Sequence, residues 1–505
     1  MAFDRRTFLK RSAAGAAILA AGPGMFKNSA FAMNSSKLQA KSDVSFVGSS
    51  SSGTRRKMIA DVLEPWRATV VSAVAGKTIL IKPNMVSLNT KGTDEALPVT
   101  HVDALRGLLD FLRSISPAAP IIIGDIPCMF APDMATMFTK CGYNDLTSEY
   151  TGATLADLNE TAHFPSIDRH FWTPSYSAST PSTIPISSVF TDPKYYIISI
   201  TRPKTHNCMV MTGVNKNILM GAPLVSAVID GKNVVPKMFM HGQSAESPVQ
   251  VTEENKCLSY NLFQMANVIY PTGQPALSVL DAWEGMEGAG PISGTSVMQY
   301  CAVAGTDPLA VDRLEAKLMG FSDTAIDPMN KAIPSYTDMR ALVWISNAGF
   351  GNYDLNKINF ILGSLADLEK YIKSYTLHSN YTGDPSYETN WTGGPPETVF
   401  DVSVVKDSCF LDPKPYLVPQ IRGAITADEV KIDFSLPVFC PIRLGIFNIR
   451  GVEVRRLGYK FLPSGRYTTV WNRRDDTGAR VPAGRYIIKL GFGSRCLCDQ
   501  ISLVK

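Results

Sequence analysis

A short segment after an apolar run concentrates residues that could bind an anion. The run YYIISI, residues 195–200, ends in Arg-Pro-Lys-Thr-His, which places Lys204 and His206 on one proline-stiffened loop. Asn215, Lys216 and Asn217 follow, beginning nine residues after His206. Lysine supplies a point charge, and side-chain amides orient carboxylate or phosphate oxygens. The segment therefore predicts a binding site for a small anionic compound.

Other predicted strands also end in charged or hydrogen-bonding residues. These residues are Lys82 and Asn84, Asp125, Asp281 with Glu287 and Gly288, and Asp307. In an open α/β sheet, ligands bind beyond the carboxyl ends of the strands, so we expect these side chains to share one site. Residues two apart in extended backbone share a face. Lys204 and His206 are therefore expected to face the ligand from a solvent-accessible loop, with Thr205 turned away.

Two chemistries fit these residues, and they are compatible. The expected catalytic residues are Lys204, His206, Asp281 and Asp307. The expected ligand-binding residues are Lys82, Asn84, Asn215, Lys216, Asn217, Glu287 and Gly288. A divalent metal would take N and O ligands, and the candidates are His206, His241 and Asp125. The alternative for Asp281 and Asp307 is that they cap turns, and His378 is expected to be peripheral.

Apolar runs alternate with helical patterns through most of the chain. Strands are predicted at "KTILIKPN", "APIIIGDI", "YYIISITRP", "PALSVLDAWEG" and "MQYCAVAGTD". Helices are predicted at "HVDALRGLLDFLRSI", with Thr100 as the N-cap, and at "PLAVDRLEAKLMG". This alternation predicts an α/β core over residues 56–377, with a parallel or mixed sheet covered by helices on both faces.

The pattern changes towards the C-terminus. Residues 378–400 are rich in turn-forming residues and are predicted to be a linker. Residues 401–505 contain short alternating strands such as "VKIDFSLP" and "RYIIKLGF", separated by turns. This spacing predicts a small all-β, Ig-like sandwich.

The first residues resemble an export signal. Arg5 and Arg6, followed by Phe8-Leu9-Lys10, match the twin-arginine pattern, and an Ala/Gly-rich run and a small-x-small cleavage site at Ala30–Ala32 come next. We expect residues 1–32 to be a signal peptide handled by the twin-arginine translocase, and residues 33–55 to be a mobile leader. The expected location is the periplasm or the exterior of a bacterium.

Composition and missing motifs narrow the classes of function. The chain has 505 residues and a net charge of +4 without a long basic block, which argues against nucleic acid as a partner. None of the nine cysteines forms a C-x-x-C pair, so an iron–sulfur cluster is not expected. No window of the mature chain predicts a membrane span. No phosphate-binding P-loop, G-x-S-x-G elbow or H-E-x-x-H motif is present.

Two sets of motifs resemble known families. "ILIKPNMV", "IIIGD", "IISITRPKTH", "GVNKNILMG", "LSVLDAWEGMEGAGPISG" and "AGTDPLAVDRLEAKLMG" together resemble the domain-of-unknown-function-362 family over about residues 77–365. "IFNIRGVEVRRL" and "SGRYTTVWNRRDDTGARVPAGRYIIKL" resemble the Ig-like module of the flagellar hook-cap protein FlgD. The second resemblance implies a structural or attachment module with a surface or protein partner, and no catalysis there.

Three hypotheses for function follow. The leading one is a metal- or cofactor-dependent enzyme that acts on a small anionic compound. The second is an exported binding protein that captures a small anion or a metal without turnover. The third is a cell-surface structural or attachment protein in which the β-sandwich does the work. The set of strand-end residues argues against the third and does not separate the first two.

Overall fold

The computed structural model describes most of the core and the C-terminal strands. The described residues are 41–89, 94–128, 131–161, 166–172, 182–229, 232–242, 251–323, 339–347, 349–381, 403–404, 420–426, 428–436, 440–462, 465–492 and 495–504. The predicted signal peptide and residues 382–400 of the predicted linker lie outside them.

The core is built on one eight-stranded mixed sheet with the strand order β14-β1-β13-β12-β7-β2-β3-β4. The strands are β14 (Ile358–Leu362), β1 (Ser42–Gly48), β13 (Thr295–Gly305), β12 (Leu277–Glu287), β7 (Tyr195–Thr201), β2 (Thr78–Lys82), β3 (Ile121–Asp125) and β4 (Ala153–Asp157). β12, β7, β2, β3 and β4 are parallel neighbours. β13 runs antiparallel to β12 and β1.

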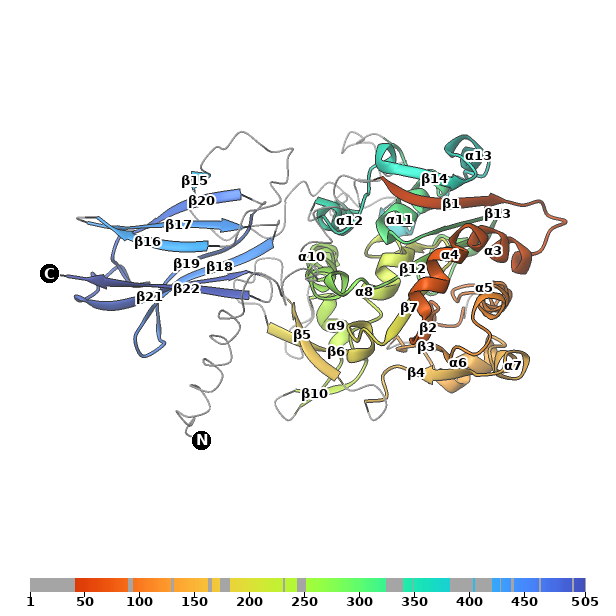
Figure 1. Ribbon diagram of the computed structural model, residues 1–505, viewed down its shortest axis with the longest axis horizontal. Coiled ribbons are helices and arrows are strands. Elements are labelled where there is room, and N and C mark those ends of the chain that lie inside the picture. The colour runs from red at the N-terminus through yellow and green to blue at the C-terminus, as the bar shows by residue number, and fades with distance from the viewer. Residues whose placement is uncertain are drawn as a thin grey trace.

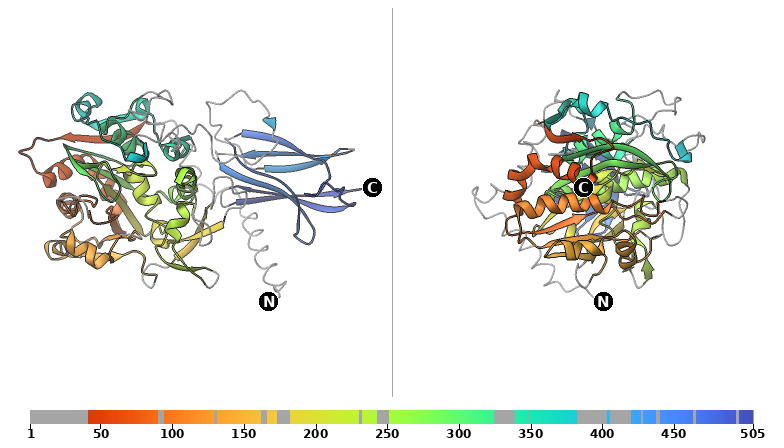
Figure 2. Two further views of the ribbon diagram at one scale, coloured as in Figure 1. Left: turned by 180° about the vertical axis from the view of Figure 1, so that it is seen from behind. Right: turned by 90° about the vertical axis from the view of Figure 1, so that its right-hand side faces the viewer.

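Helices cover both faces of this sheet, as Figure 1 and the rotated views of Figure 2 show. On one face lie α3 (Arg55–Leu63), α4 (Arg67–Val74) and α5 (Val102–Ile115). On the other lie α8 (Gly213–Leu219), α10 (Val251–Ile269), α11 (Pro308–Leu318) and α12 (Arg340–Asn347). Alternate residues of β2 point to opposite faces of the sheet. Ile79 and Ile81 pack on the face covered by α3, α4 and α5, and Leu80 packs on the other face. The predicted α/β core is confirmed.

The C-terminal strands form two four-stranded antiparallel sheets. One has the order β15 (Ser403–Val404), β20 (Gly465–Trp471), β17 (Val430–Leu436) and β16 (Gln420–Ile425). The other has the order β19 (Glu453–Leu462), β18 (Cys440–Asn448), β21 (Gly484–Phe492) and β22 (Arg495–Leu503). Inward residues of both sheets share one hydrophobic cluster around the fully buried Trp471. The predicted β-sandwich is confirmed as a fold.

The prediction of a mobile leader over residues 33–55 is wrong from Ser42 onward. Residues 42–48 form β1, which pairs with β13 and β14 inside the sheet. Val44 and Phe46 alternate with polar neighbours and are buried against α11. The Ser and Gly residues around this short strand are typical of loops, and the strand was not predicted for that reason.

The predicted linker also begins too early. Residues 379–381 form the 3₁₀ helix η6 (Ser379–Tyr381), and Tyr381 is buried in the core. Its hydroxyl accepts a hydrogen bond from the backbone N–H of Val210 at 3.1 Å. The core therefore reaches at least Tyr381.

Among the described residues, no helix combines the length and the apolar character that crossing a membrane requires.

Candidate functional site

Two neighbouring parallel strands end in a buried ion pair. β2 ends at Lys82 and β3 ends at Asp125, and the Lys82 Nζ lies 2.6 Å from the Asp125 Oδ1. Their side chains are only 1% and 5% exposed. Asp125 also accepts the backbone N–H groups of Met85 at 2.8 Å and Ile126 at 2.6 Å. Burial lowers the pKa of Lys82, and Asp125 acts in the opposite direction.

Amide side chains connect this ion pair to Lys204. The Lys204 Nζ donates to the Asn84 Oδ1 and to the backbone carbonyl of Pro98, the latter at 2.7 Å. Asn217 accepts from the Lys82 Nζ at 3.0 Å and from the Asn84 Nδ2 at 3.1 Å. Five predicted site residues, Lys82, Asn84, Asp125, Lys204 and Asn217, therefore form one buried hydrogen-bonded network.

Lys204 has an unusual environment for a lysine. Its side chain is fully buried, and its two hydrogen-bond partners are neutral oxygen atoms. Burial lowers its pKa far below the ordinary range, and the positive charges of Lys216 and Arg202 lower it further. Both effects disfavour the ammonium form of Lys204, and the carboxyl groups of Glu315 and Asp125 act in the opposite direction.

His206 lies next to Lys204 in a small antiparallel pair, β8 (Thr205–His206) with β9 (Val210–Met211). It is 3% exposed, and its Nδ1 accepts the backbone N–H of Cys208 at 3.0 Å. Burial lowers its pKa well below the ordinary range, and the nearby charges lower it further. The ring is therefore neutral, and its proton is on Nε2 because Nδ1 is an acceptor.

The charged groups with the largest effect on the pKa of His206 are basic. After burial, the groups that lower its pKa are Lys216, His241, Lys204 and His378. Lys216, His241 and His378 are each partly exposed, whereas Lys204 and His206 are buried. We call these five residues the basic cluster. His378 was expected to be peripheral and is not. The sequence around His378 could not predict its place near His206, because only the folded chain brings these two distant residues together.

The predicted exposure of the Lys204–His206 loop is wrong. Lys204 and Thr205 are 0% exposed. The β12–β13 hairpin extends beyond the sheet and covers the loop, since Lys204 bridges to Met286 and the Thr205 hydroxyl donates to the Gly288 carbonyl at 3.0 Å. Gly288 thus contacts the loop through its backbone. Substitutions in this loop will affect folding as well as binding.

Asn215 anchors α8 and does not face a ligand. Its Nδ2 donates to the Pro308 carbonyl and to the Asp312 Oδ2, each at 2.7 Å. Its Oδ1 accepts from the Tyr270 hydroxyl. Asp312 also accepts the backbone N–H of Val214 at 2.6 Å. All the hydrogen-bonding capacity of the Asn215 amide nitrogen is therefore used inside the protein.

Asp281 and Asp307 lie outside the basic cluster. Asp307 is the N-cap of α11, accepting the Leu309 N–H at 2.9 Å, so the structure favours its capping alternative. Asp281 is fully buried and its Oδ2 lies 3.3 Å from the Arg55 Nε. Glu287 accepts the Thr376 N–H at 2.7 Å and holds the chain that leads to His378. None of the three carboxylates faces Lys204.

Of the three candidate metal ligands, His206 and His241 share the basic cluster, and Asp125 lies in the ion pair with Lys82. Within the part of the chain that the structure describes, no three His, Cys, Asp or Glu side chains are grouped so that they could hold a metal ion. Asp125 already contacts Lys82 and two backbone N–H groups.

Two buried carboxyl groups on α11, Asp312 and Glu315, were missed by the sequence analysis. Burial raises the pKa of Asp312 to about 7, although Asn215 and the Val214 N–H act against it. Burial and the neighbouring Asp312 raise the pKa of Glu315 far above the ordinary range. The backbone N–H groups of Lys204 and Gly213 face the Glu315 carboxyl and act in the opposite direction on its pKa. The position of Asp312 and Glu315 inside an apolar helical pattern gave no signal of this role.

These groups predict a stability that falls as pH rises. Between the unfolded pKa of Asp312, about 3.9, and its folded value of about 7, the folded state holds a proton that the unfolded state releases. The unfolding free energy should therefore fall from about pH 5 to pH 7, by up to ~1.4 kcal/mol per unit for each such proton. Denaturant titrations of wild type and Glu315→Gln test this, because the variant should have the shallower slope. Identical slopes would contradict it.

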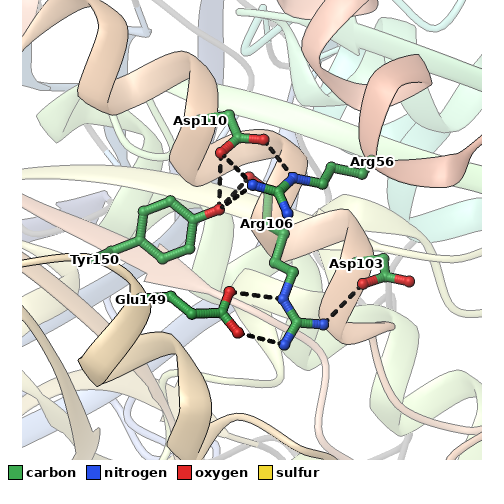
Figure 3. Close-up of a pocket in the computed structure, with 6 residues that line it drawn as sticks. All are labelled: Arg56, Asp103, Arg106, Asp110, Glu149 and Tyr150. Carbon is green, nitrogen blue, oxygen red and sulfur yellow. Dashed lines mark hydrogen bonds and ion pairs between the residues drawn. The ribbon is translucent and has the colours of Figure 1, made fainter.

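A recess on the surface is lined by charged residues and is a separate feature (Figure 3). Its lining residues are Arg56, Asp103, Arg106, Asp110, Glu149 and Tyr150. Arg56 contacts Asp110 at 2.5 Å and Arg106 contacts Glu149 at 2.6 Å, so the charges are paired. These pairs tie α3, α5 and the end of α7 (Asn144–Glu149) together. The paired charges give this recess a structural role.

Comparison with known proteins finds one family match, and it lies in the core. Residues 79–317 match the family model described as "Domain of unknown function (DUF362)", as the strand-end motifs predicted. A comparison with curated proteins finds no match. Among solved structures, the chain is similar to FlgD from P. aeruginosa, with 20% identity, a TM-score of 0.14, and coverage of 17% of this chain and 76% of that chain. It is also similar to PorZ, a surface component of the type-IX secretion system of Porphyromonas gingivalis, with 16% identity, a TM-score of 0.12, and coverage of 15% of this chain and 9% of PorZ.

Proposed function

We propose that the α/β core binds a small anionic compound at the basic cluster. The observation that carries this proposal is that Lys204 and His206 lie buried on one loop, and that the largest charged influences on the pKa of His206 are basic. Lys216 would supply the positive charge for such an anion, and the amide and imidazole groups near it would supply hydrogen bonds. Lys216, His241 and His378 are the partly exposed members of the cluster.

The anion proposal is tested by binding. Calorimetry of the mature protein with a panel of small carboxylates and phosphate should find at least one ligand. Lys216→Gln should weaken its affinity by about 10- to 150-fold, corresponding to ~1.5–3 kcal/mol for a hydrogen bond to a charged group. Lys140→Gln is the matched control, because Lys140 is exposed and lies 3.6 Å from Glu95, outside the cluster. Equal affinity in both variants would place the anion elsewhere.

Turnover of the bound anion is the enzymatic form of this proposal. The observation that favours it over simple capture is that burial lowers the pKa of both Lys204 and His206, which lie on the same loop. An amine and an imidazole of lowered pKa are both suited to accept or donate a proton near neutral pH. The proposal relies on these two groups and leaves any metal or organic cofactor unassigned.

We also propose that the protein is exported by the twin-arginine translocase to the periplasm or the exterior, with the β-sandwich as an attachment module. Replacing Arg5 and Arg6 by lysine should leave the precursor inside the cell, because lysine does not reproduce the geometry of the guanidinium pair. Cell fractionation measures this. Arg11→Lys makes the same chemical change outside the pair and should export normally. Normal export of the double variant would show that another route is used.

A further inference from the structure

We infer that the β-sandwich docks on a membrane surface that carries anionic lipids. The contact is made by the outer face of the β19-β18-β21-β22 sheet and by the turn that joins β18 to β19. This inference rests on the attachment role proposed for the sandwich and names its partner. It does not involve the basic cluster of the core.

The positive charge of the chain is concentrated in its C-terminal part. Residues 401–505 contain 17 Lys and Arg against 10 Asp and Glu, which gives a net charge of +7. The whole chain carries only +4, so residues 1–400 carry −3. The sandwich is therefore the part of the chain that an anionic surface attracts.

Four of these basic residues lie on the outer face of one sheet. Along β18 and β21 (Figure 1), buried side chains such as Leu444 and Ile488 alternate with more exposed ones. The buried side chains pack inside the sandwich, so the alternate positions form its outer face. The exposed basic residues of this face, which we call the docking face, are Arg443, Arg456, Arg485 and Lys489.

A carboxylate within the docking face neutralises only part of its charge. Glu453 contacts Arg443 at 2.8 Å and Arg456 at 3.1 Å. One carboxylate carries one negative charge and the two guanidinium groups carry two positive charges. A positive charge therefore remains even at this pair of arginines.

The other two basic residues of the docking face lie beside uncharged neighbours. Arg485 of β21 pairs across the sheet with Ser502 of β22. Lys489 lies between Gly445 on one side and Cys498 on the other. Both side chains are exposed. They can contact lipid phosphates without first leaving a carboxylate.

The turn between β18 and β19 presents apolar side chains to the solvent. Ile449 and Val452 are 71% and 57% exposed, and Arg450 lies between them in the sequence. The turn has a defined shape, because the Asn448 Oδ1 accepts the backbone N–H groups of Arg450 at 3.0 Å and Val452 at 3.1 Å. The turn therefore holds two aliphatic side chains and a guanidinium group away from the sandwich.

The combination of this turn with the docking face selects a lipid surface as the partner. Arg485 lies beside the turn, because the next residue, Tyr486, pairs with Asn448. A lipid surface can receive aliphatic side chains between its headgroups while arginines contact the phosphates. A hydrated acidic polysaccharide offers the same negative charge but would leave Ile449 and Val452 in water. The exposed aliphatic side chains therefore favour the membrane.

Sedimentation with vesicles tests the inference on the full mature chain. The vesicles contain phosphatidylcholine alone or with about 30% phosphatidylglycerol, which is anionic. Each Lys or Arg near such a surface strengthens binding about fivefold, so we expect at least about tenfold stronger binding to the anionic vesicles. About 1 M salt, at which the Debye length is about 3 Å, should remove most of this difference. Equal binding to both kinds of vesicle, or binding to neither, overturns the inference.

Matched arginine variants test the docking face. Arg485→Gln should weaken binding to the anionic vesicles about fivefold. Arg466→Gln makes the same change at an exposed residue of β20, which belongs to the other sheet, and should bind like the wild type. Equal binding by the two variants would show that the docking face is not the contact.

Matched valine variants test the turn. Val452→Ser should weaken binding about fourfold to tenfold, because it withdraws one or two methyl groups from the lipid. Val228→Ser makes the same change in β10 (Ala227–Ile229) of the core, at a residue that is 68% exposed, and should have no effect. If Val452→Ser binds vesicles like the wild type and the protein is retained on an acidic polysaccharide such as alginate, the partner is a polysaccharide and the lipid surface is wrong.

Cell fractionation separates this inference from the proposed attachment role. Exported protein that sediments with the cell envelope but binds no vesicles keeps the attachment role and overturns the lipid partner. Protein that stays in the soluble fraction and binds no vesicles overturns both. Sedimentation with the envelope that is lost in Arg485→Gln and kept in Arg466→Gln supports both.

Discussion

Replacing Asp125 by asparagine should lower the free energy of unfolding of the core by about 3–5 kcal/mol, which is the usual cost of removing one partner of a buried ion pair. Lys82 would keep its position at the end of β2 but lose the carboxylate 2.6 Å away. Water cannot replace that partner, since the two side chains are 1% and 5% exposed. Lys82 could release its proton and so avoid being a buried, unpaired charge, and this limits how much unfolding free energy the variant can lose. Denaturant unfolding followed by fluorescence measures the change.

The matched control is Asp110→Asn on the surface of the same domain. Asp110 contacts Arg56 at 2.5 Å, so its ion pair is as short as that of Asp125 (Figure 3). The side chains of Arg56 and Asp110 are, however, 48% and 37% exposed. Exposed pairs contribute about 0–1 kcal/mol because water and salt screen them. Equal losses in the two variants would mean that burial does not govern the contribution of Asp125.

The sequence predicted that Lys82 and Asp125 lie close together, although not as an ion pair, and it gave capping only as the alternative role of Asp307. Lys82 and Asp125 each end an apolar run, and parallel neighbours bring such ends to one edge. Asp307 also follows an apolar run, but that run, β13, is antiparallel to β12. Its C-terminal end therefore lies at the opposite edge of the sheet. An apolar run does not show whether its strand will be parallel or antiparallel to its neighbours. Its position after a strand therefore predicts that a residue belongs to the site only where that strand is parallel.

The burial of the site could not be anticipated either. A loop after a strand is usually at the surface, and Lys204 and His206 were expected to be accessible for that reason. The β12–β13 hairpin, whose tip lies more than 80 residues further along the chain, covers them. His378 joins the basic cluster by the same kind of long-range contact. Local patterns predicted the residue types of the site, and tertiary contacts determine the burial that shifts their pKa values.

Gly213 is the position where the fold and the basic cluster depend most directly on each other. It begins α8, has a φ of +71°, and a Cβ there would lie 2.5–2.6 Å from all three carboxyl atoms of Asp312. Asp312 holds the start of α8 through the Val214 N–H and the Asn215 amide. α8 in turn carries Lys216 and Asn217. A side chain at residue 213 would therefore displace both the carboxylate and the helix.

Gly213→Ala should accordingly destabilise the core by about 3–5 kcal/mol. Of this, ~1–2 kcal/mol is the strain of a left-handed conformation, and ~1.5–3 kcal/mol is the loss of hydrogen bonds to a charged carboxylate. Gly76→Ala isolates the first part, because Gly76 has a φ of +72° and no atom within 4 Å of its added Cβ. Anion affinity should also fall in Gly213→Ala alone, since only α8 carries Lys216. If the two variants lose the same stability and bind the anion equally well, Asp312 does not position α8, and the link between the buried carboxylate and the basic cluster is wrong.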